Sequence, residues 1–140
     1  IANSVFVDTS GWASLFVVNE TYHPQATAYL QAALQNQHRL VTSNYVIAEL
    51  VALLHSPLRQ PRSQIFQIID AIKTVAYVEI IHIDLEADTA SWSLCKSRQD
   101  KAWSLVDCAS FVLMEHMDIR DALTRDRHFE QAGFIRLLKS

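Results

Sequence analysis

Residues 4–10 read Ser-Val-Phe-Val-Asp-Thr-Ser, so that a short apolar run passes directly into the carboxylate of Asp8. β-Branched and aromatic residues in such a run favour a buried strand. An aspartate at this point can simply end the strand and start a turn. An apolar run that ends in Asp-Thr-Ser is also frequent at sites of metal or phosphoryl chemistry. Both interpretations of Asp8 stay open on this stretch alone.

The same alternation of short apolar runs and longer helix-period segments continues along the chain. Strands are predicted at residues 4–7, 39–42, 78–83, 122–124 and 135–138. Helices are predicted at residues 11–18, 24–36, 44–55, 62–74, 85–98, 105–117 and 127–132. Strands that alternate with helices indicate a parallel sheet with helices on both faces, which right-handed crossovers arrange as a doubly wound α/β sandwich.

Capping residues support the predicted helix boundaries. Ser10, Ser43 and Asp84 stand where each could accept a hydrogen bond from the first turn of the following helix. Gly133 is expected to end the short helix that starts near Arg127.

The composition is that of one packed domain spanning residues 1–140. Half of the residues are apolar and 19% are charged, which excludes a disordered chain. The formal net charge of −3 provides no overall attraction for nucleic acid and argues against a simple DNA-coating protein. Basic residues are absent from residues 1–38 and gather toward the C-terminal end, at Arg98, Lys101, Arg120, Arg125, Arg127, Arg136 and Lys139. A basic rim around an acidic centre is compatible with this pattern.

Cysteine content and hydropathy indicate a protein of the reducing cytoplasm. Cys95 and Cys108 lack a CxxC spacing and are too few for a disulfide framework, and Cys108 is expected to be a buried free thiol. No signal peptide or membrane span is recognisable, because Glu49 interrupts the longest apolar helical stretch.

Four carboxylates lie among apolar residues that belong in a core: Asp8, Glu49, Asp107 and Asp126. Lone carboxylates are almost never buried without a partner or a metal. Two carboxylates about 5 Å apart repel by roughly 3 kcal/mol at an effective dielectric near 20, so four together call for a cation. Open parallel sheets bind ligands outside the carboxyl ends of their strands, where Asp8 and Asp126 are expected and which Glu49 and Asp107 could reach.

Three of these acids also have a purely structural interpretation. Glu49 could be a surface residue of its helix. Asp107 could complete a capping box with Ser104, and Asp126 could cap the helix that follows it. Asp100 is less central, and we expect it to support the site rather than to hold a ligand.

Other catalytic patterns are missing from the sequence. It contains no P-loop, no GxGxxG and no Ser/His/Asp arrangement, and the histidines lack an HxxxH spacing, which disfavours a zinc site. A haloacid-dehalogenase phosphotransferase would need an aspartate at the position of Ser10. His128 adjoins Asp126 and could touch a substrate, but a solvent-facing or capping role is the favoured interpretation.

Ordered motifs span nearly the whole chain. They are Val-Asp-Thr-Ser at 7–10, Ile-Ala-Glu-Leu at 47–50, Ser-Leu-Val-Asp-Cys-Ala-Ser-Phe at 104–111, Leu-Thr-Arg-Asp-Arg-His-Phe at 123–129 and Ala-Gly-Phe at 132–134. With these motifs the chain resembles the PIN-domain nucleases, and among them the VapC-type toxin ribonucleases of prokaryotic toxin–antitoxin pairs. A single Asp-Thr-Ser carries no information, but ordered motifs with family-like spacing are specific.

The resemblance implies a three-layer α/β/α sandwich around a central, mostly parallel sheet of four or five strands. It also implies a Mg²⁺ or Mn²⁺ site at Asp8, Glu49, Asp107 and Asp126. Thr124 and Ser10 match polar positions that often support such a site. Hard oxygen ligands suit either ion. No motif acid is missing, so a catalytically competent member is expected.

We therefore expect an endoribonuclease in which metal-activated water attacks an RNA phosphodiester bond in line. The resemblance suggests products that end in 5′-phosphate and 3′-hydroxyl. Weaker candidates for phosphate contacts are Arg98, Lys101, Arg125 and Arg127. The resemblance also implies a small VapB-like antitoxin that covers the site, and a helix-mediated homodimer with contacts near the hairpin around Pro57 and Pro61.

Two other classes of function remain in view. A non-catalytic module that keeps the fold and binds RNA or protein would show no metal-dependent turnover. A nuclease for structured DNA is less favoured, because the chain is small and has no helical insertions.

Overall fold

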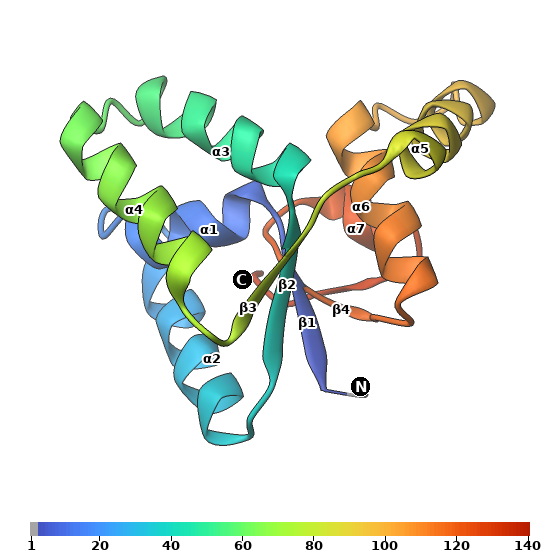
Figure 1. Ribbon diagram of the computed structural model, residues 1–140. Coiled ribbons are helices and arrows are strands. Elements are labelled where there is room, and N and C mark those ends of the chain that lie inside the picture. Colours follow the sequence, from blue (N-terminus) through green and yellow to red (C-terminus); the bar gives the residue numbers. More distant parts are fainter. Residues whose placement is uncertain (1–2) are drawn as a thin grey trace.

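Five strands form one parallel sheet in the computed structural model, which describes residues 3–140 (Figure 1). The strands are β1 (Ser4–Val7), β2 (Arg39–Ser43), β3 (Val78–Ile81), β4 (Asp121–Leu123) and β5 (Ile135–Arg136). Their order across the sheet is β3-β2-β1-β4-β5. The strand order reverses at β1, and open sheets of this kind bind ligands at the carboxyl ends of the strands beside such a reversal.

Seven helices in the described part of the chain cover the two faces of the sheet. They are α1 (Thr9–Phe16), α2 (His23–Gln35), α3 (Asn44–His55), α4 (Arg62–Thr74), α5 (Leu85–Ser97), α6 (Leu105–His116) and α7 (Arg127–Gln131). Helices α1 to α4 lie on one side of the sheet and α5 to α7 on the other, left and right in Figure 1. The expected α/β/α sandwich is confirmed. Within residues 3–140, no helix has both the length and the apolar character needed to cross a bilayer.

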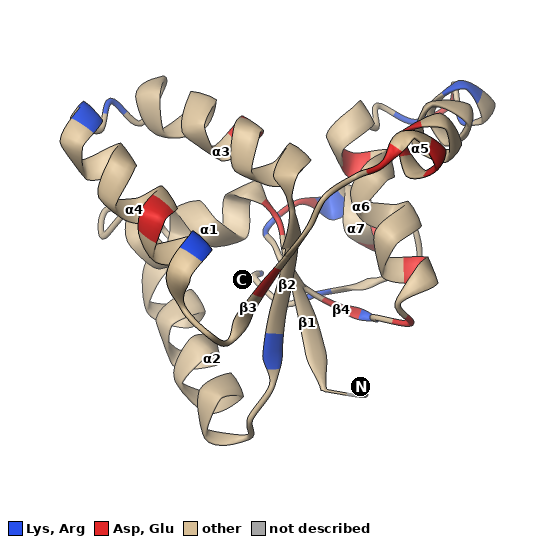
Figure 2. Cartoon of the chain, viewed as in Figure 1, with Lys and Arg blue, Asp and Glu red and all other residues tan. Residues whose placement is uncertain are grey.

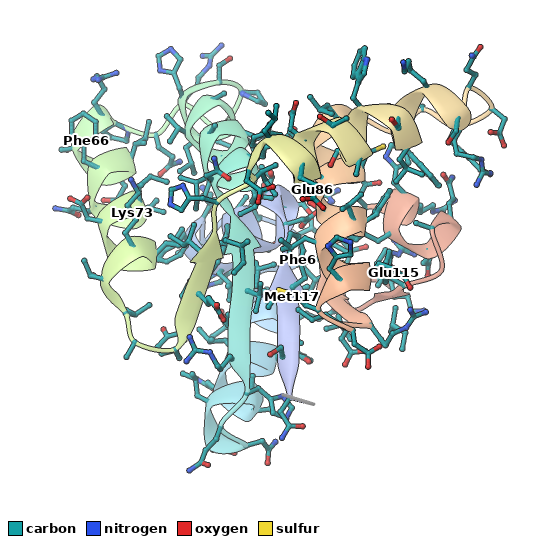
Figure 3. The ribbon with its side chains drawn as sticks, turned by 45° about the vertical axis from the view of Figure 1, so that its right-hand side comes forward. Phe6, Phe66, Lys73, Glu86, Glu115 and Met117 are labelled. Carbon is teal, nitrogen blue, oxygen red and sulfur yellow. The ribbon has the colours of Figure 1, made fainter. Side chains whose placement is uncertain are left out.

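The central strand β1 is packed from both sides. Phe6 has no exposed surface, points toward α6 and α7 (Figure 3), and stacks on Phe129 with 6.3 Å between ring centroids. On the opposite face Trp12 is buried, and its indole N–H donates a hydrogen bond of 3.1 Å to the hydroxyl of Thr42. These contacts hold β1 in place, and therefore also Asp8, the residue that follows it.

The first helix begins earlier than predicted. It starts at Thr9 rather than at residue 11, so Ser10 lies inside α1 and the prediction that Ser10 caps it is wrong. Asp8 is the cap instead, because its Oδ1 accepts a hydrogen bond of 2.8 Å from the backbone N–H of Gly11.

The remaining boundaries differ from the predictions by only a few residues. Ser43 and Asp84 cap α3 and α5 as predicted, and Gly133 follows α7 with a φ of 95°. The strand predicted at 78–83 ends at Ile81, because Ile81 pairs with Ser43, the last residue of the neighbouring strand. The strand predicted at 135–138 is confined to residues 135–136, and the strand predicted at 122–124 is shifted to 121–123.

Helix α1 packs its first turn directly against the end of β4, and Gly11 permits this approach. A Cβ atom on Gly11 would lie 2.0 Å from the carbonyl oxygen of Leu123, so a larger residue would force the two elements apart. The contact sets the residue before α1, Asp8, beside the residue after β4, Thr124.

Candidate active site

A pocket of about 520 Å³ opens at the carboxyl end of the sheet, between α3 and the first turn of α6. All four predicted acids line it: Asp8, Glu49, Asp107 and Asp126. Figure 2 shows acidic segments of α3, of α6 and of the loops at the upper end of the sheet around this region. Apolar side chains, among them Ala52, Leu53 and Val106, form part of its walls. The topology therefore brings the four carboxylates to one place, as expected.

Asp8 is the most enclosed of the four acids, with 7% of its surface exposed. Its Oδ1 accepts hydrogen bonds from the backbone N–H of Gly11 at 2.8 Å and from the hydroxyl of Ser10 at 2.9 Å. Its Oδ2 accepts one from the hydroxyl of Thr124 at 2.6 Å. Burial raises the pKa of Asp8 to about 7 against the effect of these hydrogen bonds, and the nearby charge of Asp126 adds to the rise. A cation at this position would favour the ionised carboxylate.

Thr124 and Ser10 link the loop after β4 to the start of α1. The hydroxyl of Thr124 accepts a hydrogen bond of 3.0 Å from the backbone N–H of Asp126 while it donates to Asp8. The hydroxyl of Ser10 accepts one of 3.0 Å from the backbone N–H of Arg125. The structure thus places both hydroxyls beside the acids that they were expected to support.

Glu49 reaches the pocket from the exposed face of α3. Its Oε1 accepts a hydrogen bond of 2.5 Å from the hydroxyl of Thr9, which connects α3 to the first residue of α1. The prediction that Glu49 is embedded in a core is wrong, because α3 carries apolar residues on more than its buried face. Val51, for example, is 40% exposed.

Asp107 belongs to the start of α6 and to the pocket at once. The predicted capping box is present: the hydroxyl of Ser104 accepts from the backbone N–H of Asp107 at 3.0 Å, and Oδ2 of Asp107 accepts from the backbone N–H of Ser104 at 3.1 Å. The side chains of Asp107 and Asp126 are 14% and 35% exposed. The argument from burial therefore holds in full only for Asp8.

His128 lies between Asp107 and Asp126, a position that was not predicted from the sequence. Its Nδ1 is 2.8 Å from Oδ2 of Asp107 and 3.4 Å from Oδ1 of Asp126. Asp126 caps α7 as predicted, because its Oδ1 accepts from the backbone N–H of His128 at 2.9 Å. One ligand atom from each of these three side chains lies within 4.8 Å of the others. The solvent-facing or capping role favoured for His128 is wrong, and the Asp-x-His spacing at a helix start is the signal that could have revealed it.

Asp100 and Arg98 pair with each other outside the pocket. The Nε and Nη2 atoms of Arg98 each lie 3.0 Å from a carboxylate oxygen of Asp100, and this hydrogen-bonded pair holds the pKa of Asp100 below its usual value. The side chain of Asp100 is 61% exposed and is not among the residues that line the pocket. Contrary to expectation, the structure does not bring Asp100 next to the acids.

The other predicted basic residues are sequence neighbours of residues that line the pocket. Lys101 precedes Ala102, which lines it, and the exposed Arg125 and Arg127 stand on either side of Asp126 in sequence. The guanidinium carbon of Arg125 lies 5.4 Å from the centre of the Tyr22 ring.

Cys108, which follows Asp107, is the buried free thiol that was expected. Burial, reinforced by a hydrogen bond between the Cys108 and Cys95 thiols, raises the pKa of Cys108 to about 12. Cys108 is therefore protonated at neutral pH and is a poor nucleophile.

Comparisons with known proteins agree with this arrangement. A family model for the PIN domain matches residues 5–135. The 23S rRNA-specific endonuclease VapC20 of Mycobacterium tuberculosis, from strains CDC 1551/Oshkosh and ATCC 25618/H37Rv, is 28% identical over 131 residues, which cover 94% of this chain and 95% of that protein. The crystal structure of M. tuberculosis VapC20, a sarcin–ricin loop cleaving toxin, matches with a TM-score of 0.79 and 27% identity over 94% of this chain and 96% of that one. These matches confirm the resemblance that the motifs predicted.

Proposed function

Since this chain belongs to the PIN domain family, we propose that it is an endoribonuclease that requires a divalent metal ion and hydrolyses RNA phosphodiester bonds. The observation that carries this proposal is the pocket in which Asp8, Glu49, Asp107 and Asp126 lie together. The similarity to a 23S rRNA-specific endonuclease supports RNA as the substrate class.

The side chains of the pocket fit Mg²⁺ or Mn²⁺. Carboxylate oxygens are the hard ligands that both ions prefer. Within residues 3–140, none of the four acids forms an ion pair with a lysine or arginine, so their charge is left for a cation to balance. Asp8, whose pKa is about 7, would gain most from such a cation. When bound, the ion neutralises the scissile phosphate and lowers the pKa of a bound water.

The side chains around the ion each have a position set by the fold. Asp8 is held by the hydroxyls of Ser10 and Thr124, and Glu49 by the hydroxyl of Thr9. These contacts fix two of the carboxylates that line the pocket before RNA arrives, which limits the reorganisation needed for catalysis. Water then attacks in line and leaves products with 5′-phosphate and 3′-hydroxyl ends, so the 2′-hydroxyl does not react.

Basic residues beside the pocket are proposed to hold the RNA backbone on either side of the cut. The candidates are Lys101, Arg125 and Arg127, which adjoin pocket-lining residues in sequence, and each phosphate contact would make binding more sensitive to salt. Arg98 is a weaker candidate because Asp100 already occupies its guanidinium group.

A toxin role is proposed on the same family grounds. The partner would be a small VapB-like antitoxin that covers the acidic pocket and its apolar walls, and the toxin itself would act as a homodimer in the cytoplasm. The relative's description as a toxin supports this assignment.

Cleavage of labelled structured RNAs by the purified full chain tests the proposal. The panel includes tRNAs and a 23S rRNA fragment with the sarcin–ricin loop, in Mg²⁺, in Mn²⁺ and in EDTA. We expect discrete cuts that need metal and that disappear in Asp107→Asn, which retains an oxygen for the capping box. Asp70→Asn, at an exposed position of α4, is the matched control and should cut normally.

Failure has a clear meaning in this experiment. RNA binding without cleavage in either metal, with equal affinity in Asp107→Asn, would favour the non-catalytic binding module. Cleavage that persists in Asp107→Asn would remove Asp107 from the proposed metal site.

A further inference from the structure

The ring of His128 occupies a position suited to a metal ligand rather than to a surface histidine. Its Nδ1 faces a carboxylate oxygen of Asp107 at 2.8 Å and one of Asp126 at 3.4 Å, and the side chain is 28% exposed. We propose that His128 supplies a nitrogen ligand to the same divalent ion that Asp107 and Asp126 hold, so that the centre prefers Mn²⁺ to Mg²⁺. This inference rests on the proposed function and adds a nitrogen ligand to the proposed oxygen ligands.

The two separations from Nδ1 are close to the spacing of neighbouring ligands in an octahedral site. Neighbouring ligands of a six-coordinate ion with bonds of about 2.1 Å lie about 3.0 Å apart. The two measured separations from Nδ1, 2.8 Å and 3.4 Å, lie on either side of that value. Nδ1 therefore lies at ligand spacing from both carboxylates, and the three ligand atoms all lie within 4.8 Å of one another.

Two helix starts hold these side chains in place. Asp107 is locked into the capping box of α6, and Asp126 caps α7 through the backbone N–H of His128 itself. The next residue, Phe129, is 1% exposed and packs edge-to-face on Phe111 of α6 with 5.0 Å between ring centroids. The aromatic contact fixes α7 against α6, so the imidazole and the two carboxylates are presented by one rigid unit.

The chemistry of a nitrogen ligand predicts which ion benefits. Mg²⁺ binds oxygen and retains its waters, whereas imidazole is a common ligand of transition metals. Replacing one oxygen ligand by an imidazole nitrogen should therefore raise the affinity for Mn²⁺ relative to that for Mg²⁺. The ring must carry its proton on Nε2 for Nδ1 to bind the ion.

The competing arrangement uses the other tautomer. If Nδ1 carries the proton, it donates a hydrogen bond to Asp107 and merely orients that carboxylate, as outer partners of metal ligands do. Nδ1 would then have no free lone pair and could not bind the ion. The two arrangements differ in whether a nitrogen is bonded to the metal.

Pulsed electron paramagnetic resonance of Mn²⁺ bound to the full chain distinguishes them without RNA cleavage. We expect a coupling to one directly bound ¹⁴N nucleus, which changes to the ¹⁵N pattern when all histidines carry ¹⁵N. The coupling should vanish in His128→Gln and persist in His38→Gln, a control at the opposite end of the sheet. By calorimetry, the ratio of Mn²⁺ to Mg²⁺ affinity should fall about tenfold in His128→Gln and stay unchanged in the control.

Each negative result has a separate meaning. Mn²⁺ that binds to the wild-type chain without a nitrogen coupling, but not to Asp107→Asn, would overturn this inference and leave the proposed metal site standing. A wild-type chain that binds neither ion would overturn both. A coupling that persists in a folded His128→Gln variant, checked by urea unfolding in EDTA, would assign the nitrogen to another residue and overturn the inference. If His128→Gln does not fold, the same coupling is measured in His128→Asn and in the ¹⁵N-histidine wild type. Its loss in His128→Asn and its change to the ¹⁵N pattern in the wild type support the inference, and any other result overturns it.

Discussion

The hydroxyl of Thr124 lies 2.6 Å from Oδ2 of Asp8, so a residue just after β4 holds the carboxylate that follows β1. Replacing Thr124 with valine removes this donor and should lower both Mn²⁺ affinity and the single-turnover cleavage rate about tenfold, because the hydrogen bond favours the ionised form of Asp8. Thr124→Ser retains the hydroxyl and should keep most of both. An equal loss in the two variants would show that retaining the hydroxyl does not preserve the site, and it would contradict this prediction.

Asp8 should make the metal-free protein less stable as the pH rises. Its pKa is about 7 in the folded state against 3.8 for an unperturbed aspartate, so between these values the folded protein holds a proton that the unfolded chain releases. The destabilisation begins above pH 4 and is complete above pH 7. Between pH 5 and pH 8 it should amount to about 2–3 kcal/mol.

Urea unfolding in EDTA at pH 5 and at pH 8 measures this effect. As the pH rises, the free energy of unfolding of the wild type should fall relative to that of Asp8→Asn, because only the wild type has the Asp8 carboxyl group. A difference that is the same at both pH values would contradict the raised pKa. In the wild type, the affinity for Mn²⁺ should increase with pH up to about 7 and then level off, because ion binding needs the ionised carboxylate.

Gly11→Ala should destabilise the fold by about 3 kcal/mol, because the added Cβ would lie 2.0 Å from the carbonyl oxygen of Leu123. The loss appears in thermal or urea unfolding. Ser63→Ala, at an exposed position of α4, is the control and should change stability by less than about 0.5 kcal/mol. A Gly11→Ala variant as stable as the control would mean that α1 and β4 can separate freely.

The α3–α4 hairpin is predicted to form the homodimer. Phe66 is 54% exposed on α4 and stands at the edge of the molecule, away from the sheet (Figure 3). Phe66→Glu should therefore shift the protein to a monomer at micromolar concentration in light scattering. Leu85→Glu, at an 82% exposed position of α5 on the other side of the sheet, should not. A wild-type chain that is already monomeric would rule out the predicted dimer.

The alternation of strands and helices was sufficient to predict the sheet, and it placed Asp8 and Asp126 at one edge because parallel strands all end there. The expectation that Glu49 and Asp107, which lie within helices, would join them came from the resemblance to the family. The alternation did not predict which side chains form hydrogen bonds with one another. Whether Asp8 or Ser10 caps α1 depends on which oxygen reaches the amide of Gly11. The contact of Thr9 with Glu49 and the placement of His128 arise from how helices pack on one another, which periodicity does not specify.

The bond between Thr124 and Asp8 joins residues that are 116 positions apart. During synthesis, Asp8, Glu49 and Asp107 are translated while the strand that must lie beside β1 does not yet exist. A nascent or truncated chain that ends before β4 therefore carries three of the four acids but no assembled pocket. The pocket can therefore assemble only after the segment that forms β4 and carries Thr124 and Asp126 has been synthesised.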